Sequence, residues 1–540
     1  MAAKRHKTRK SGTAVFWLFL SLCLSVSAVN LSCSSKPTDL RTLVPAETLV
    51  YLETNDLAAA LQPIVDNTVF GEVAKKKPDL SALKGVQLAV AVTGFETSEE
   101  KLTDEHSIGR VQPHFVAIAD THAWNFQAVK FAELKLGSFV ESIYDSAPTL
   151  EKSDKSGGKY FTWTAKDGRK AYALVIDSLI YFGNDETSIE KCLAVKRGEA
   201  DSIVKTGKVQ PADPATLASG YVATNGIAQI ANIAGLQFAS QSSDDSEIQS
   251  AIAGLLPQLL RGSITEISWT ATKKGQGYEE KYKITTPPEI GKIFSETLVP
   301  ASQFDTSVFE FFPDDGPSAT FYNLKDPQIA WRSVLLTAQK QTDPIAGKLI
   351  GEFSGAFFEP YGIRDPKMFL VASGANILTV KFDEEGEKSV VITTLKDIEK
   401  AKKSLVTGLK PNKQSTDETG VEIWKSEEDE IAAAFVENKL IVGQTEGVLK
   451  CLNARSNGRN FNKNALIMRL FATDAVTTTI ARDKSTAAIL AEVLSEKKSD
   501  DAQAISIYRT ETRFTRTGIE RHTFSDFGLI GSIIAQLAQD

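Results

Sequence analysis

The segment Ala171–Leu193, AYALVIDSLIYFGNDETSIEKCL, occurs a second time in this 540-residue chain as Ala432–Leu452, AAAFVENKLIVGQTEGVLKCL. Each copy predicts a strand, a short polar turn, a second strand that ends at Gly183 or Gly443, and a helix that contains Lys-Cys-Leu. Convergence on a strand pattern would reproduce the apolar positions, but not the turn and the glycine in the same order. We therefore predict that the chain contains two copies of one structural unit.

The segments around these copies also recur in the same order, and they set the limits of the predicted units. The helix Gly291–Leu298, GKIFSETL, has a counterpart near the end of the chain in Gly531–Leu537, GSIIAQL. Matched residues lie about 240 to 270 positions apart, whereas the units of solenoid proteins are only ~20 to 50 residues long. The sequence therefore predicts two domain-sized repeats, residues 42–298 and 304–538.

The order of the predicted elements indicates the fold class. Strands come in adjacent pairs joined by short turns, which is typical of antiparallel sheets, and amphipathic helices between them would cover the sheet. We predict an α+β fold of two tandem, pseudo-symmetric repeats, each a mainly antiparallel sheet covered by helices. The expected strands include Val86–Val92, Phe115–Ala119 and Met368–Val371, with a charged loop over Glu96–Arg110.

Two of the four cysteines lie in the body of the chain. Cys192 and Cys451 hold the same place in the two repeated segments, each beside a leucine on the apolar side of its predicted helix. We expect both to be buried and unbridged, because a buried free cysteine behaves as a small apolar residue. If the repeats share one fold, Cys192 superposes on Cys451, and Trp163 of the preceding strand superposes on Trp424.

The N-terminus has the features of an export signal. Five basic residues in the range 4–10 precede the apolar stretch Ala14–Val29, which small polar residues follow. The stretch is shorter than the ~18 to 20 apolar residues that span a bilayer, so a cleaved signal is expected. Cleavage after Ala28 would give a secreted protein, whereas the sequence LSC ending at Cys33 resembles the box at which bacterial lipoproteins are cut and acylated.

Lipidation at Cys33 is the preferred interpretation, with residues 1–33 as the signal and residues 34–41 as a tether to the folded body. The alternative is a soluble periplasmic or secreted protein. Removal of the five basic residues of the signal would change the formal charge from −7 to about −12. A chain this acidic does not fit sequence-independent binding to nucleic acid, or to anionic lipid through a basic face.

The opening of the body, Pro45–Glu53 with the sequence PAETLVYLE, resembles a family of bacterial exported proteins, described as lipoproteins, that is catalogued only as a domain of unknown function. The likeness extends through the strand-rich repeats over most of the chain after Thr42. It implies a location in the cell envelope, on the periplasmic face of a bacterial membrane. It assigns no catalytic or binding residue.

Motifs for catalysis and metal binding are weak. His106, His114 and His122 recur every eight residues, but along an extended strand His114 and His122 would lie about 25 Å apart, too far to share an ion. Residues 81–84 match SxxK and residues 205–207 match KTG, as in penicillin-binding enzymes, but the SxN element between them is missing. We therefore predict no metal site, no cofactor and no catalytic residue.

Other features have two interpretations each. The acidic clusters Asp383–Glu387 and Glu427–Glu430 fall between predicted strands and are expected to be solvated turns. The apolar helical stretches Ile248–Leu260 and Leu349–Phe358 either pack in the core or form a groove for an apolar ligand or a partner.

The sequence thus favours a non-catalytic envelope protein, anchored through Cys33, that binds or scaffolds an unidentified partner. A periplasmic carrier of a lipid or another apolar ligand is the second hypothesis. A hydrolase with an unrecognised site is the third.

Overall fold

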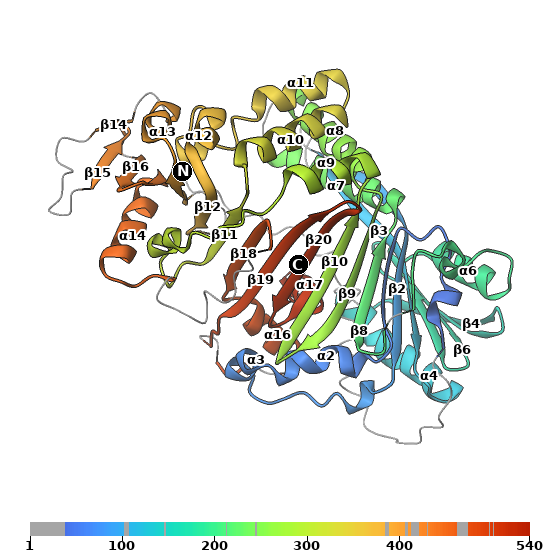
Figure 1. Ribbon diagram of the computed structural model, residues 1–540. Coiled ribbons are helices and arrows are strands. Elements are labelled where there is room, and N and C mark those ends of the chain that lie inside the picture. Colours follow the sequence, from blue (N-terminus) through green and yellow to red (C-terminus); the bar gives the residue numbers. More distant parts are fainter. Residues whose placement is uncertain are drawn as a thin grey trace.

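The computed structural model describes residues 38–101, 107–144, 147–211, 213–242, 246–383, 388–405, 409–411, 421–428, 430–461, 474–495, 497–499 and 502–539. The strands of these residues form one sheet of 20 strands, and 15 α-helices pack around it (Figure 1). Neighbouring strands are antiparallel, including the pair β10 and β20 that joins the two halves of the chain. The predicted α+β class with antiparallel sheet is confirmed.

The sheet extends outward in two directions from the junction of β10 and β20. One half holds β10 (Gly277–Thr285), β9 (Glu266–Lys274), β8 (Thr216–Val222), β1 (Val50–Thr54), β2 (Gln87–Lys101), β3 (Ser107–Asp120), β7 (Leu179–Gly183), β6 (Lys170–Ile176), β5 (Gly158–Thr164) and β4 (Thr149–Lys155). The other half holds β20 (Gly518–Ser525), β19 (Ser506–Thr515), β18 (Thr477–Asp483), β11 (Ser318–Asn323), β12 (Ser373–Lys381), β13 (Ser389–Leu395), β17 (Lys439–Gln444), β16 (Ile431–Val436), β15 (Glu422–Lys425) and β14 (Lys410–Pro411).

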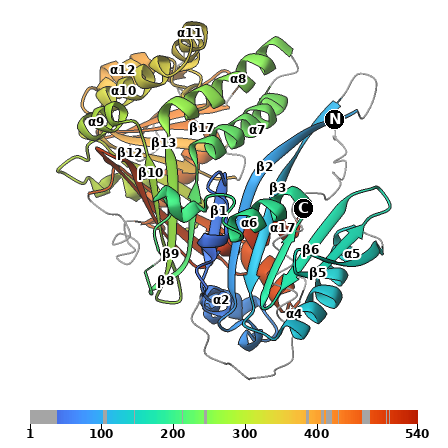
Figure 2. The same cartoon turned by 90° about the vertical axis from the view of Figure 1, so that its right-hand side faces the viewer.

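The strand order is the same in both halves. If the ten strands of each half are numbered from 1 to 10 along the chain, both halves have the spatial order 10-9-8-1-2-3-7-6-5-4 from the junction outward. The hairpin of β2 and β3 is longer than that of β12 and β13, and Figure 2 shows it as a long, curved pair of strands.

Helices connect the strands. In the first half they are α2 (Leu57–Asp66), α3 (Thr68–Val73), α4 (Asn125–Phe131), α5 (Gly137–Ile143), α6 (Glu186–Lys196), α7 (Thr224–Ser242), α8 (Ser246–Ser263) and α9 (Pro288–Thr297). In the second half they are α10 (Pro327–Lys340), α11 (Pro344–Phe353), α12 (Pro366–Ala372), α13 (Ile398–Ser404), α14 (Thr445–Ser456), α16 (Thr486–Leu494) and α17 (Gly528–Gln539). Short helical turns include η1 (Leu40–Leu43), η2 (Ser81–Leu83), the π-helical η3 (Ala132–Leu136), η4 (Ile203–Thr206), η5 (Thr306–Phe311) and η6 (Glu359–Tyr361). None of the described helices is long and apolar enough to cross a membrane.

The two faces of the sheet carry different layers, and we name each face after a residue on it. On the Trp269 face, helices such as α2, α16 and α17 cover the sheet around a large apolar core. On the Lys281 face, η1 and α6 cover the outer strands of the first half, while η5 and α14 cover those of the second half. In Figure 1, α7 to α11 lie at one end of the central strands and α2, α3 and α16 at the other.

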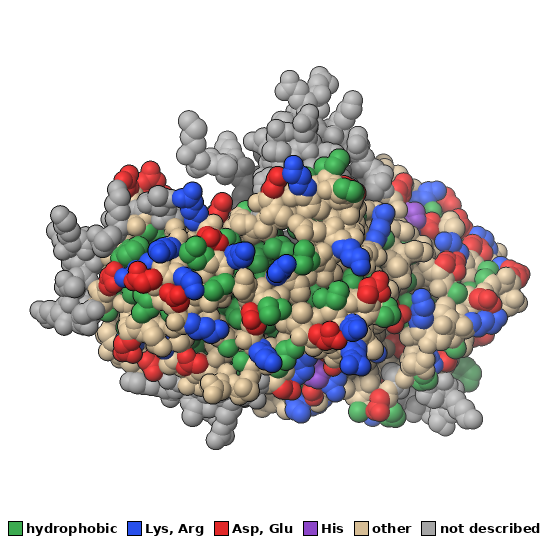
Figure 3. All heavy atoms as spheres, turned by 45° about the horizontal axis from the view of Figure 1, so that its top comes forward, with side chains coloured by type: hydrophobic (Ala, Val, Ile, Leu, Met, Phe, Trp, Pro, Cys, Tyr) green, Lys and Arg blue, Asp and Glu red, His purple; other side chains and the backbone are tan. Residues whose placement is uncertain are grey.

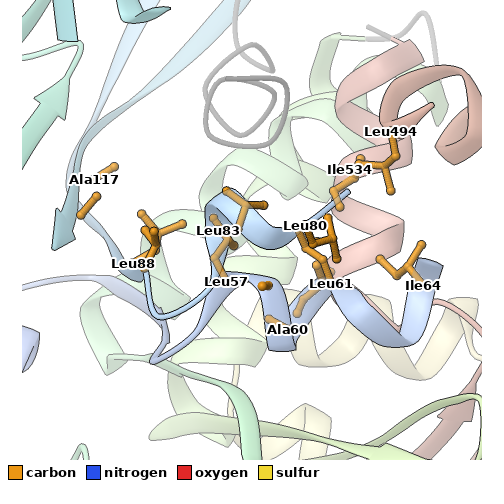
Figure 4. Close-up of a cluster of buried hydrophobic side chains, with 14 of the residues drawn as sticks. Leu57, Ala60, Leu61, Ile64, Leu80, Leu83, Leu88, Ala117, Leu494 and Ile534 are labelled. Carbon is orange, nitrogen blue, oxygen red and sulfur yellow. The ribbon is translucent and has the colours of Figure 1, made fainter. Parts of the chain in front are cut away.

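The last helix of each half packs on the opposite half. Phe294 of α9 meets Phe514 of β19 with ring centroids 5.8 Å apart. In return, Gly528 at the start of α17 lies against Tyr278 of β10 so closely that an added Cβ would be 2.9 Å from its ring. Figure 4 shows the resulting shared core, in which Leu494 and Ile534 lie beside side chains of α2. The two predicted repeats therefore share one large core on the Trp269 face, although each half also has buried clusters of its own.

The repeated hairpins form as predicted, and their turns explain why the polar residues recur. Asp177 and Glu437 adopt positive φ angles of 54° and 57°, which are uncommon for residues other than glycine. At the end of the second strand, a Cβ on Gly183 would lie 2.4 Å from the carbonyl oxygen of Phe115, and a Cβ on Gly443 would lie 2.2 Å from that of Ser389. Both glycines are therefore required by close approach to the neighbouring strand.

Three local predictions were wrong. Met368–Val371 is helical within α12, because Asp365 Oδ1 accepts a hydrogen bond from Met368 N and Pro366 occupies the first turn. The charged segment Glu96–Arg110 mostly continues β2 and β3, apart from residues 102–106 between them, which lie outside the described ranges.

The third error concerns the tryptophans. Ala173 and Ala433 each stand four residues before their turn, and Ala173 pairs with Phe161 while Ala433 pairs with Trp424. Phe161, and not Trp163, therefore holds the register position of Trp424. The cause is that the connection between β15 and β16 is shorter than the connection between β5 and β6. Trp424 and Ala433 are nine positions apart in the sequence, whereas Phe161 and Ala173 are 12 positions apart.

Candidate functional site

The predicted lipidation residue, Cys33, lies outside the described residues. The other two cysteines of interest are on α6 and α14, where Cys192 and Cys451 are both 0% exposed and free. Burial raises the pKa of Cys192 to about 12 and that of Cys451 well above its ordinary range. Because the thiolate is the nucleophile and the metal ligand, these thiols are chemically inert at neutral pH.

Two of the three histidines that recur every eight residues are described, His114 on β3 and His122 just after it. His114 Nε2 lies 3.2 Å from Glu96 Oε2, and His122 Nδ1 lies 3.4 Å from Asp120 Oδ1. His106 falls outside the described residues. Within the described part of the chain, no group of three or more His, Cys, Asp or Glu side chains is arranged to hold a metal ion.

The serine and lysine of the penicillin-binding pattern are not brought together. Ser81 is exposed in η2, whose Leu83 belongs to the core on the Trp269 face. Lys205 is in η4, whose Ile203 belongs to the core on the Lys281 face, and it forms an ion pair with Asp201 at 2.5 Å. The two motifs therefore lie on opposite sides of the sheet.

The predicted apolar helical stretches form much of α8 and the region from α11 to η6. Gln258 of α8 accepts a hydrogen bond from Asp343 N at the start of α11, so these helices lie side by side. Several large apolar side chains here are exposed, including Ile345 at 76% and Phe357 at 72%. Figure 3 shows hydrophobic side chains among charged ones on this side of the molecule.

The Trp269 face carries a small apolar recess between α2, α17 and the central strands. Its floor includes Leu52, Val90 and Trp269, and Leu57 and Ile533 contribute from the two helices. The cavity volume is about 50 Å³. Ligand pockets for small molecules are usually about 300 to 1,000 Å³, so the recess suits an apolar side chain of a partner rather than a whole lipid.

On the same face, five threonines stand directly opposite one another across five adjacent strands of the second half. The row consists of Thr379, Thr320, Thr479, Thr510 and Thr523. The Oγ1 atoms of Thr320 and Thr479 are 3.0 Å apart, as are those of Thr510 and Thr523. All five are partly exposed, so the row presents hydroxyl and methyl groups at the spacing of the strands, about 4.8 Å.

The corresponding row of the first half is mostly apolar. It consists of Val90, Leu52, Gly220, Trp269 and Tyr282, which pair with one another in that order. Three of these residues line the recess. The open middle of the Trp269 face is therefore half hydroxyl-rich and half apolar, although the strand order of the two halves is the same.

The Lys281 face is charged at the junction. Lys281 lies opposite His522 and Lys283 lies opposite Glu520, beside a groove of about 260 Å³ that Ser268 and Thr270 also line. These residues mix both signs of charge, so the groove has no strong preference for anions or cations.

An ion network extends the charged region into β19. Arg513 contacts Asp474 at 2.8 Å and Glu511 at 2.9 Å, and Arg509 contacts Glu511 at 2.9 Å. The sequence alone indicates neither the threonine row nor this network, because both depend on the register between strands that are far apart in the chain.

Comparisons with known proteins add little to this geometry. The sequence matches no family model and no curated protein. A solved structure, described as "Structure of crystal form IV of TP0453", aligns with 48% of this chain and 84% of its own, at 9% identity and a TM-score of 0.23. A likeness this weak carries no argument about the fold or the function of the chain.

Proposed function

We propose that this chain is an exported, membrane-anchored protein of the bacterial cell envelope that binds or scaffolds a partner and catalyses no reaction. The basic N-terminus, the apolar stretch Ala14–Val29 and the box ending at Cys33 support export and lipidation. Thr38, five residues after Cys33, already contacts the body through Asp120, which suits a short tether between an acyl anchor and the body.

The proposal includes a duplicated body, with residues 42–298 and 304–538 as two copies of one unit. Three observations support it. The halves have the same strand order, their repeated hairpins share a positive φ at Asp177 and Glu437, and each closes at a glycine that touches the third strand of its half. The buried cysteines on α6 and α14 follow those hairpins in both halves.

A non-catalytic role is supported by the state of the candidate nucleophiles. The two body thiols are buried with raised pKa values, and the SxxK and KTG segments lie on opposite faces of the sheet. The two thiols are therefore out of reach of a substrate, and the serine of SxxK and the lysine of KTG are too far apart to act on the same substrate.

The observation that best supports binding is the open middle of the Trp269 face. A row of threonine hydroxyls lies on the same face of the sheet as an apolar recess, so a partner could find both hydrogen bonds and a socket for an apolar side chain there. The volume of the recess, about 50 Å³, favours a macromolecular partner over the carrier hypothesis.

Replacement of Cys33 tests the anchor. Cys33→Ala should release the protein from the membrane fraction or block its maturation, because the acyl chains attach to that thiol. Unchanged membrane attachment would show that the anchor lies elsewhere, and intact Met1 in the cytoplasm would contradict export.

A photo-crosslinking amino acid at Thr479 tests the binding face in cells. We expect a discrete protein adduct from Thr479, suppressed when Thr510→Arg fills the next position of the same row. Incorporation at Ser153, on the exposed outer strand β4, is the matched control. An adduct of lipid mass at Thr479 would favour the carrier, and equal adducts at both positions would contradict a specific face.

A further inference from the structure

The beginning of α4 exposes two aromatic side chains that the body does not use for packing. Trp124 is 62% exposed and Phe126 is 68% exposed. Leu134, on the π-helical turn η3 that directly follows α4, is 52% exposed. We call Trp124, Phe126 and Leu134 the α4 patch.

Helix stability does not explain the tryptophan. Trp124 occupies the N-cap position of α4, where its side chain caps no backbone amide, although Gln127 Oε1 accepts a hydrogen bond from Trp124 N. Aspartate, serine, threonine and asparagine are the residues that stabilise this position. The helix after the third strand of the second half, α13, has Asp397 there, and its Oδ1 accepts from Lys400 N at 3.0 Å.

The patch lies where the N-terminal tether meets the body. Thr38 Oγ1 donates to Asp120 Oδ2 at 2.6 Å, and His122 N donates to Asp120 Oδ1 at 3.1 Å. Four residues separate Asp120 from Trp124, a reach of at most about 14 Å. Five residues separate Thr38 from Cys33, a reach of at most about 18 Å. The two reaches together place the exposed aromatics at most about 35 Å from the predicted acyl anchor.

We propose that Trp124 and Phe126 insert into the headgroup region of the bilayer that holds Cys33, so that the body rests on the membrane through the α4 patch. This inference rests on the proposed lipid anchor, which sets the bilayer beside the patch. An indole ring is suited to the interface because its apolar body enters the hydrocarbon while its N–H stays hydrated.

Two aromatic side chains would bind a membrane weakly by themselves. The tether holds them close to the surface, at an effective concentration in the millimolar range for a short linker, so a weak contact is sufficient. The contact needs no basic face, which agrees with the acidic charge of the chain.

The test uses the chain from Ser34 onward, which contains all the described elements and lacks both the apolar signal and Cys33. Flotation with phosphatidylcholine vesicles, some carrying bromine in the upper acyl chain, should show partition and quenching of tryptophan fluorescence. The double variant Trp124→Ser, Phe126→Ser should bind the vesicles at least about tenfold more weakly, because it removes the apolar area that would be buried in the membrane. It should also lose the quenching. Trp124→Phe should restore the partition but not the quenching.

The matched control is Ile345→Ser with Phe357→Ser, which removes two apolar side chains near α11 that are even more exposed than Trp124 and Phe126. The proposal is overturned if this control weakens vesicle binding as much as the patch variant does. It is also overturned if the patch variant leaves vesicle binding unchanged. A third contrary outcome is that the protein self-associates in the absence of vesicles and the patch variant abolishes this self-association, because the patch would then be a contact between proteins. Failure of the Cys33 anchor itself appears separately, in fractionation of the Cys33→Ala protein.

Discussion

The carboxylate of Glu280 on β10 accepts a hydrogen bond from the backbone amide of Leu529 on α17, 2.8 Å away, although 249 residues separate them in the chain. Trp269 Nε1 donates to the same oxygen at 3.1 Å. Glu280 is only 2% exposed, and burial raises its pKa while the two hydrogen bonds partly oppose that rise. A single acid thus joins the end of the chain to the sheet of the first half.

This raised pKa predicts how stability depends on pH. The folded protein holds the proton of Glu280 more tightly than the unfolded chain does. The stability that Glu280 contributes through this proton is therefore fully present below the pKa of the unfolded state and is lost as the pH rises through the pKa of the folded state. Glu280→Gln keeps an acceptor for both donors without the buried charge, so we expect a higher melting temperature at pH 7 and a smaller difference near pH 4. Thermal unfolding of both proteins across this range checks it, and a lower melting temperature for the variant at pH 7 would contradict it.

Removal of the acceptor altogether should have the opposite effect. Glu280→Ala leaves the Trp269 N–H and the Leu529 N–H without their partner, and an unsatisfied buried donor costs about 1 to 3 kcal/mol. We expect urea denaturation to show that loss at every pH at which Glu280→Gln is folded.

The glycines that close the repeated hairpins predict a matched pair of destabilised variants. Gly183→Ala and Gly443→Ala would each place a methyl group against a neighbouring carbonyl oxygen, so each should lower the free energy of unfolding by about 1 to 3 kcal/mol. Gly71→Ala in α3 meets nothing within 4 Å and should raise it by up to about 1 kcal/mol. Denaturant titration of the three variants compares them, and a neutral result at Gly183 or Gly443 would refute the close approach.

Burial of the two body cysteines predicts their reactivity. In the chain from Ser34 onward, Ellman's reagent should find no rapidly reacting thiol below pH 10 in the native state, because burial blocks access and holds the thiols protonated. Two thiols should react after denaturation, since no disulfide joins them. Ser153→Cys on β4 supplies an exposed control thiol, and rapid labelling without it would show that a body cysteine is accessible.

The shared core predicts that both halves unfold together. Ile534 of α17 is 1% exposed among side chains of α2, so Ile534→Ala should cost about 2 to 5 kcal/mol and shift one common transition. Ile507→Ala, at a residue that is 44% exposed on β19, should change stability by less than about 0.5 kcal/mol. Calorimetry distinguishes a single shifted transition from two transitions. Two separated peaks in the thermogram of Ile534→Ala would show that the halves unfold independently.

Local patterns in the sequence were sufficient to predict the repeated hairpins, because each depends on neighbouring residues. Asp177, Gly183 and the helix that follows are close in the chain, and their turn and strand chemistry recurs around Glu437 and Gly443. The helix at Pro366–Ala372 was mistaken for a strand because four apolar residues look alike in both structures. Its aspartate cap and its proline were the signals that could have corrected the prediction.

The exchange of α9 and α17 between the halves could not be predicted. Periodicity shows that Gly291–Leu298 and its counterpart are helices with an apolar side, but not which strands that side will cover. The threonine row was equally hidden, because Thr379 and Thr523 share it only through the register of the three strands between them. The α4 patch left one trace in the sequence, a tryptophan where a capping residue would be expected.

The junction of β10 with β20 also determines where the sheet stops. The halves are joined through the same edge strand of each, so the edges that remain among the described strands, β4 and β14, are alike and neither is complementary to the edge already used. A head-to-tail union would have left two matching edges and a route to polymerisation. The remaining edges also resist growth, since β4 carries Glu151, Lys152, Asp154 and Lys155, and β14 ends in Pro411, which has no N–H to donate. The charges on β4 and the proline of β14 therefore oppose the pairing of these two edges with strands of another molecule.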